Sequence, residues 1–287
     1  MASGRFDGYG FGTDVMAVMA SSHSGEDRHV RTVMAALRAG SLSASVLHCG
    51  THAPYDRETA ARLARDGEAP TEIRHNCSGK HAGMALHAKA AGWPIDDYWR
   101  PDHPVQMSSR DAVALMTGVP AVKIPTATDG CGVVTFGVPL RGLALAYARL
   151  ADPRTVAEPD MSHALERIRN AMMEHPDLVA GSRGRLDTAL MQVASGRLVA
   201  KTGAEGIQAL AVLAGGRSTA AWGVAIKIED GDGARRAAAV ATCAALAQFD
   251  ALSDGELREL REFANPRVHD LARHTVVGEV RSAFSLA

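Results

Sequence analysis

The chain has 287 residues, of which 46% are hydrophobic and 22% charged, as is ordinary for a soluble globular protein with a sizeable core. Its formal net charge is −1, so it has no basic surplus to neutralise phosphates, and we expect no nucleic-acid partner. No apolar run approaches the length of a membrane span and no signal peptide is visible, so we expect no membrane contact and a cytoplasmic location.

Apolar residues at helical spacing predict a series of helices in the first two thirds of the chain. The helix predicted at residues 26–38 stops at Gly40, and that at residues 84–91 stops at the sequence Gly-Trp-Pro, which is a normal helix end. Further helices are expected at residues 14–19, 59–65, 104–116, 141–150 and 161–173.

The last third of the chain contains the predicted strands. Residues 198–201 and 207–213 are short and apolar, and residues 219–228 (TAAWGVAIKI) form the best strand candidate. A tight turn, EDGDG, separates this strand from a long Ala-rich helix predicted at residues 234–249. Helices followed by antiparallel strands predict an α+β fold, and the absence of a Pro/Ser-rich linker predicts one domain over residues 1–287.

The segment ASSHSGE, residues 20–26, crowds hydroxyls, an imidazole and a carboxylate just before a predicted helix. Ser24 suits the capping of that helix, because it stands three residues before an acidic position. Capping does not require Ser22, which lies two residues upstream and next to His23. The sequence leaves a structural and a catalytic interpretation of this segment open.

The densest cluster of reactive side chains is RHNCSGKHAG, residues 74–83. Cys77, Lys80 and His81 lie within one turn of each other if this segment is helical. Cysteine and histidine are natural zinc ligands, and a nearby cation lowers the pKa of a thiol. A phosphate-binding loop is disfavoured because its preceding glycine spacing is missing, and a buried cysteine before a capped helix is the remaining alternative.

A second thiol stands in TDGCG, residues 128–132, where Cys131 lies between two glycines and could meet Cys77 in a metal site. The segment CGTHAP, residues 49–54, could add a ligand or a substrate contact, although a turn with a hydrogen-bonded histidine is the simpler interpretation. Without an export signal, reduced thiols or metal ligands are favoured over disulfides for the four cysteines, at positions 49, 77, 131 and 243.

Lys201-Thr202-Gly203, at the end of a predicted strand, matches one of the three signatures of serine β-lactamases and penicillin-binding proteins. In those enzymes the lysine and the threonine face the nucleophilic serine. The companion Ser-x-x-Lys is absent, because the residues three before the five lysines are Cys77, Leu86, Pro120, Leu198 and Val224. The tripeptide alone is therefore a weak signal.

In chain order, the segments ASSHSGE, CGTHAPYD, HNCSGKHAGM, DHPVQ, DGCGV, RLDTALM, AKTGAEG and KIEDGDG resemble the zinc-containing L-asparaginase II family. The resemblance spans residues 3–249, and HNCSGKHAGM with DGCG is its most specific part. It implies a serine β-lactamase/glutaminase-like α+β fold, with helices packed on an antiparallel sheet beside a helical cluster. It also implies a homodimer that hydrolyses the side-chain amide of L-asparagine to L-aspartate and ammonia.

The resemblance also implies roles for individual residues. Ser22 and Lys201 match the second Ser-Lys pair of the family and are expected to be catalytic. Cys77, Lys80 and Cys131 match the ligands of a zinc ion (Zn2+), and a lysine ligand is unusual because its amine must lose a proton to bind. Residues that we expect to contact the substrate are His81, Asp129, His52 and Glu26.

One family segment is missing: a Ser-x-x-Lys-Pro sequence upstream of ASSHSGE, whose serine is the expected nucleophile. By family spacing it would fall just before Met1, so we expect this chain to lack that helix and the strands before it. Two alternatives to an asparaginase stay open. One is a related amidohydrolase such as a glutaminase or β-lactamase-like enzyme, and the other is a non-catalytic protein that binds zinc and an amino acid, which the missing Ser-x-x-Lys favours.

Overall fold

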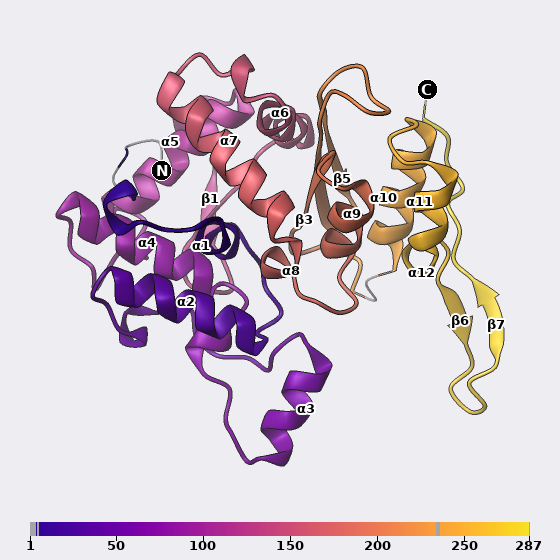
Figure 1. Cartoon of the computed structure of the whole chain (residues 1–287), viewed down its shortest axis with the longest axis horizontal. Coiled ribbons are helices and arrows are strands. Elements are labelled where there is room, and N and C mark those ends of the chain that lie inside the picture. The colour runs from indigo at the N-terminus through magenta and orange to yellow at the C-terminus, as the bar shows by residue number, and fades with distance from the viewer. Residues whose placement is uncertain (1–3, 5, 234–235, 287) are drawn as a thin grey trace.

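Figure 1 shows the computed structural model of the chain, which describes residues 4, 6–233 and 236–286. The helices are α1 (Thr13–Met19), α2 (Asp27–Ala39), α3 (Arg57–Arg65), α4 (Ser78–Ala91), α5 (Pro104–Thr117), α6 (Leu140–Ala151), α7 (Pro159–Glu174), α8 (Pro176–Val179), α9 (Leu186–Ala194), α10 (Ala237–Gln248), α11 (Asp254–Glu259) and α12 (Arg261–Ala264). The strands are β1 (Thr126–Thr128), β2 (Val134–Phe136), β3 (Leu198–Thr202), β4 (Ile207–Val212), β5 (Trp222–Lys227), β6 (Arg267–His269) and β7 (Val276–Glu279). Short 3-10 helices are η1 (Asp7–Tyr9), η2 (Ala44–Val46), η3 (Glu72–Arg74), η4 (Ala121–Lys123) and η5 (Pro153–Thr155).

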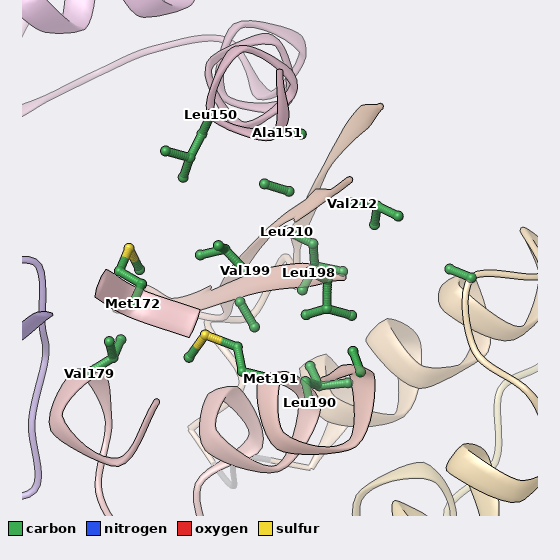
Figure 2. Close-up of a cluster of buried hydrophobic side chains, with 14 of the residues drawn as sticks. Leu150, Ala151, Met172, Val179, Leu190, Met191, Leu198, Val199, Leu210 and Val212 are labelled. Carbon is green, nitrogen blue, oxygen red and sulfur yellow. The ribbon is translucent and has the colours of Figure 1, made fainter. Parts of the chain in front are cut away.

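A three-stranded antiparallel sheet, in the order β3-β4-β5, stands between two groups of helices (Figure 1). The central strand β4 is buried from Gln208 to Val212, because side chains pack on both of its faces. Figure 2 shows Leu150 and Ala151 of α6 on one side of the strands, and Leu190 and Met191 of α9 on the other. The strands β3 and β5 are the edges of this sheet.

Helix α1 connects two hydrophobic cores. Its Met16 and Ala17 belong to the core around the sheet, whereas Val18 belongs to a second core built with α2 and α4. Gly79 allows α4 to approach α1 closely, since a Cβ at this position would lie 2.1 Å from the carbonyl oxygen of Val18. This contact fixes the start of α4 against the last turn of α1.

Two hairpins complete the described fold. Strands β1 and β2 pair in the register Thr126↔Phe136 and present the turn of residues 129–133. Strands β6 and β7 pair as Arg267↔Glu279, and every residue of both strands is exposed. Figure 1 shows this second hairpin projecting away from the body of the molecule.

Most of the predicted elements are confirmed, with changed boundaries. Helix α4 begins at Ser78 rather than at residue 84. The prediction started too late because the first turns of the helix carry Gly79, Lys80 and Gly83 instead of an apolar stripe. The strand predicted at residues 219–228 is shorter, since its pairing with β4 begins at Trp222↔Val212. The last long helix is α10, and residues 234 and 235 of its predicted range lie outside the described residues.

The α+β class is confirmed, with helices packed on small antiparallel sheets. The serine β-lactamase/glutaminase-like arrangement and the single domain stay predictions. Sequence patterns did not predict helices α8, α9, α11 and α12 or strands β1, β2, β6 and β7. In the part of the chain that the structure describes, we find no helix with the length and apolar character needed to cross a membrane.

Candidate active site

Ser22 lies in an extended segment between α1 and α2 that is held at its backbone. Its N–H donates to the carbonyl of Val179 at 3.0 Å, and its own carbonyl accepts from Arg185 Nη2 at 3.0 Å. The N–H of His23 donates to the carbonyl of Asn76 at 3.1 Å. The segment is thus tied to the ends of α8 and of the loop before α4, and the Ser22 side chain is left half-buried.

A cavity of ≈ 440 Å³ opens beside Ser22. Its volume falls in the range of about 300–1,000 Å³ that is typical of small-molecule sites. Polar side chains from several parts of the chain reach its wall, among them Ser22, Asn76, Arg185, Thr202 and Gln208. The sheet edge and the segment after α1 therefore face a common space.

The Asn76 side chain connects the polar groups around Ser22. Its Nδ2 donates to Ser22 Oγ at 2.9 Å and to Cys77 Sγ at 3.5 Å. Its Oδ1 lies 2.9 Å from His52 Nε2, and the His52 ring packs edge-on against His75 with centroids 4.3 Å apart. One amide thus joins a serine hydroxyl, a thiol and an imidazole.

Three metal-binding side chains meet next to this network. The ligand atoms of Cys77, Asp129 and Cys131 all lie within 4.8 Å of one another. Cys77 precedes α4, while the other two residues stand in the turn after β1, which the bond from Asp129 N–H to the carbonyl of Val133 closes at 2.8 Å. These residues form a group that can hold a metal ion.

Lys80 and His81, on the first turn of α4, adjoin this metal-binding group. Lys80 Nζ donates to Asp129 Oδ2 at 3.3 Å. His81 is fully buried, and its Nδ1 lies 2.7 Å from the hydroxyl of Tyr98. Its Nε2 is buried without a hydrogen-bond partner among the described residues. A buried ring nitrogen seldom lacks a partner, so this atom fits a site that takes an ion or a water molecule.

The two thiols have opposite tendencies to ionise. The hydrogen bond from the Cys77 thiol lowers the pKa of Cys131, with contributions from His81 and Lys80 that together outweigh burial. The same hydrogen bond and burial raise the pKa of Cys77. Burial disfavours the Lys80 ammonium, but Cys77, Cys131 and Asp129 overcome it and raise the pKa of Lys80. The group thus favours ionisation of the Cys131 thiol over that of Cys77, while the Lys80 ammonium pairs with Asp129.

Lys201 lies on β3 and is not one of the cavity-lining residues. Successive side chains of a strand point to opposite faces, so Lys201 and its neighbour Thr202, which lines the cavity, diverge. Lys201 Nζ donates to the carbonyl of Thr202 at 2.6 Å. Burial lowers the pKa of Lys201, the charge of Arg185 adds to this effect, and Asp187 opposes it. Among the described residues, the Lys201 amine and the Ser22 hydroxyl share no hydrogen bond.

Glu26 stands apart from the other expected substrate contacts. It is the N-cap residue of α2, and its carboxylate accepts from Ser182 N–H at 2.7 Å and from the Ser182 hydroxyl at 2.8 Å. Asp129 belongs to the metal-binding group, His81 adjoins it, and His52 contacts the Asn76 amide. The structure thus gathers most of the expected site residues and leaves Glu26 in a structural contact.

Sequence reasoning missed several residues of this site. Asn76 lies inside the segment HNCSGKHAGM, but nothing in its spacing marks it as the connecting residue. Arg185 and Asp187 fall in RLDTALM, which reads as an ordinary helix start. Their roles depend on contacts with Ser22 and Thr202, which are remote in sequence.

The described residues thus place the Ser22 hydroxyl at a cavity and, next to it, a group that can hold a metal ion. The family model for L-asparaginase II matches residues 1–282, and the chain belongs to this family. Membership supports an asparaginase-type amidohydrolase that acts on a small molecule. Comparison with curated proteins gives no match.

Proposed function

We propose that the chain is an L-asparaginase, which hydrolyses the side-chain amide of L-asparagine to L-aspartate and ammonia. The observation that carries this proposal is the Asn76 amide, which bonds both to Ser22 Oγ and to Cys77 Sγ. A serine at a cavity and a metal-binding thiol therefore share one neighbour. Acyl transfer requires a nucleophile beside a group that stabilises the developing oxyanion, and this arrangement can offer both.

In the proposed reaction, the Ser22 hydroxyl attacks the side-chain carbonyl carbon of asparagine and gives up its proton. The C–N bond then breaks, and the amide nitrogen takes up this proton and leaves as ammonia. Water then hydrolyses the aspartyl ester and restores the serine hydroxyl. Lys201 is the proposed proton acceptor, because burial lowers its pKa and a lysine acts as a base only when neutral. Since it shares no hydrogen bond with Ser22, the proton must pass through a bridging group such as water.

Zinc is the proposed metal, with Cys77, Lys80 and Cys131 as its protein ligands and Asp129 beside them. Two cysteine sulfurs and a carboxylate oxygen in one group suit zinc, and the unpartnered His81 Nε2 leaves a polar atom to face it. A bound zinc ion would act as a Lewis acid that polarises a carbonyl oxygen. Lys80 must release its proton to become a ligand, so we expect zinc binding to weaken as the pH falls.

The proposal is tested with a panel of substrates and the purified chain in zinc-supplemented buffer. We expect ammonia release from L-asparagine at enzyme-like rates, and slower release from L-glutamine. Hydrolysis of glutamine alone, or of a chromogenic β-lactam alone, would replace this proposal with a glutaminase or a β-lactamase-like enzyme. Light scattering of the same sample tests the homodimer that the resemblance implies.

A second candidate is a non-catalytic protein that binds zinc and asparagine. It is favoured by the lack of a hydrogen bond between the described side chains of Ser22 and Lys201. Titration calorimetry distinguishes it from the enzyme. Heat of asparagine binding without any ammonia release would establish the binding protein and reject the asparaginase.

A further inference from the structure

A buried carboxylate lies behind the strand that carries Lys201. Asp187, in the first turn of α9, has no exposed surface. A buried charge is costly unless hydrogen bonds or an opposite charge compensate it. No salt bridge to Asp187 is found among the described residues, so its hydrogen bonds must offset the loss of water.

Three donors from two strands point at this carboxylate. Asp187 Oδ2 accepts from the N–H of Thr202 at 2.8 Å, while Oδ1 accepts from the Thr202 hydroxyl at 2.8 Å and from Gln208 Nε2 at 2.9 Å. Thr202 and Gln208 are also partners in the register of β3 and β4. One side chain of α9 therefore clamps the last residue pair of the two strands.

The Thr202 N–H can donate to Asp187 because it lies on an edge strand. Strand β3 is at the edge of its sheet, so an N–H that points away from β4 has no ladder partner. Asp187 supplies the missing acceptor. The carbonyl of the same Thr202 accepts from Lys201 Nζ at 2.6 Å. The carboxylate, Thr202 and the lysine amine thus form one continuous chain of contacts.

From this chain of contacts we infer that Asp187 is a positioning residue for Lys201, acting through Thr202. Its carboxylate holds the N–H and the hydroxyl of Thr202, and the carbonyl of this same residue accepts from the amine, so the amine keeps one orientation at the sheet edge. The inference rests on the proposed function for its catalytic meaning. The held geometry of the amine itself can be measured whether or not the chain is an asparaginase.

The test uses the full chain with carbon-13-labelled lysine, whose five residues give few and assignable signals. The signal that disappears in Lys201→Met belongs to Lys201. We expect Asp187→Asn to displace this signal from its position in the unmodified chain. We expect the double variant Asp187→Asn/Gln208→Glu to restore it, because the pair again provides one carboxylate and one amide in the same network.

Thr188→Val is the matched control. Thr188 is the next residue of α9, is also buried, and its hydroxyl donates to the carbonyls of Pro176 and Gly181 rather than to a group of β3. We expect it to lower the melting temperature and to leave the Lys201 signal in place. If Asp187→Asn does not fold, Thr202→Val removes only one of the three donors and should cause a smaller displacement.

Kinetics give the catalytic part of the test. In an active chain, Asp187→Asn should lower kcat on the order of 10–100-fold with little change in KM, since a misplaced catalytic group affects turnover rather than binding. A chain without ammonia release would reject the proposed function alone. An unchanged Lys201 signal in folded Asp187→Asn, or an equal displacement in Thr188→Val, would overturn the positioning role.

Discussion

At the scale of single residues, Cys77 tests the metal-binding group most simply. We expect Cys77→Ala to weaken zinc binding by more than about 100-fold, because a coordinating thiolate is lost from a small ligand set. The measurement is the zinc content after dialysis against a weak chelator. Cys243→Ala is the control, since Cys243 is also a free thiol but lies buried on α10 in the core around the sheet. Full zinc retention by Cys77→Ala would contradict the assignment.

His23 and His29 form a buried pair that makes stability depend on pH. Their rings stack 4.7 Å apart, and each accepts a backbone N–H at Nδ1, from Gly25 and Glu26 respectively, so both rings are neutral. Burial, with Arg28 and Arg185, lowers the pKa of His29 to about 4, against the opposing charges of Glu26 and Asp56. The pKa of His23 is lowered in the same direction by burial and by His29.

A depressed histidine pKa sets the direction of this pH effect. The unfolded chain takes up the proton near pH 6.5, whereas folded His29 does so only near pH 4. Stability should therefore be complete above pH 6.5 and fall between pH 6.5 and 4, by up to about 3 kcal/mol for this residue. Urea unfolding at a series of pH values measures the slope. His29→Asn should be less stable at pH 7.5. In this variant the slope of unfolding free energy against pH should decrease by the equivalent of about one bound proton, and an unchanged slope would contradict the account.

At the scale of elements, the crossing of α1 and α4 places the site. Gly79→Ala would put a Cβ 2.1 Å from a backbone oxygen, which cannot move without shifting α1, so we expect a loss of about 1–3 kcal/mol or more in unfolding free energy. Gly83→Ala is the matched control on the same helix. Its Cβ would meet only the flexible Met19 side chain at 3.3 Å, and alanine improves helix propensity. Equal effects of the two variants in denaturant unfolding would argue against the close crossing.

The sequence predicts those elements best in which hydrophobic periodicity is strong. Helix α2 buries Val33, Ala36 and Leu37 on one face, and its predicted range is nearly correct. Helix α9 is buried on most sides, including at Asp187 and Thr188, so no amphipathic pattern reveals it. The short hairpins were missed because a strand of three or four residues is too short for an alternation of polar and apolar residues to stand out.

The candidate site was predictable in part, at those residues whose chemistry is distinctive. Cys77 and Cys131 have distinctive chemistry in glycine-rich segments, and the structure brings them together. The connecting residues Asn76, Arg185 and Asp187 are ordinary types at ordinary spacing. Their roles arise only when α4, α9 and β3 meet, which no local pattern encodes.

At the scale of the whole molecule, we expect the chain to unfold as one unit. The two larger cores share helix α1, which contributes Met16 to one and Val18 to the other. Neither core can therefore unfold alone without disrupting the packing of this helix in the other. Circular dichroism and tryptophan fluorescence should give coincident transitions. Trp93 packs against the second core and Trp222 against the first, so each core has its own reporter. Two separated transitions would show two independent domains.

The most direct test of the central claim compares ammonia release from L-asparagine by the chain and by its Ser22→Ala variant, both folded and loaded with zinc. If Ser22 is the nucleophile, the chain turns over asparagine and the variant is slower on the order of 1,000-fold or more, because the acyl-enzyme cannot form. Equal rates for the two proteins would show that Ser22 is not the nucleophile, and no release by either would reject the asparaginase.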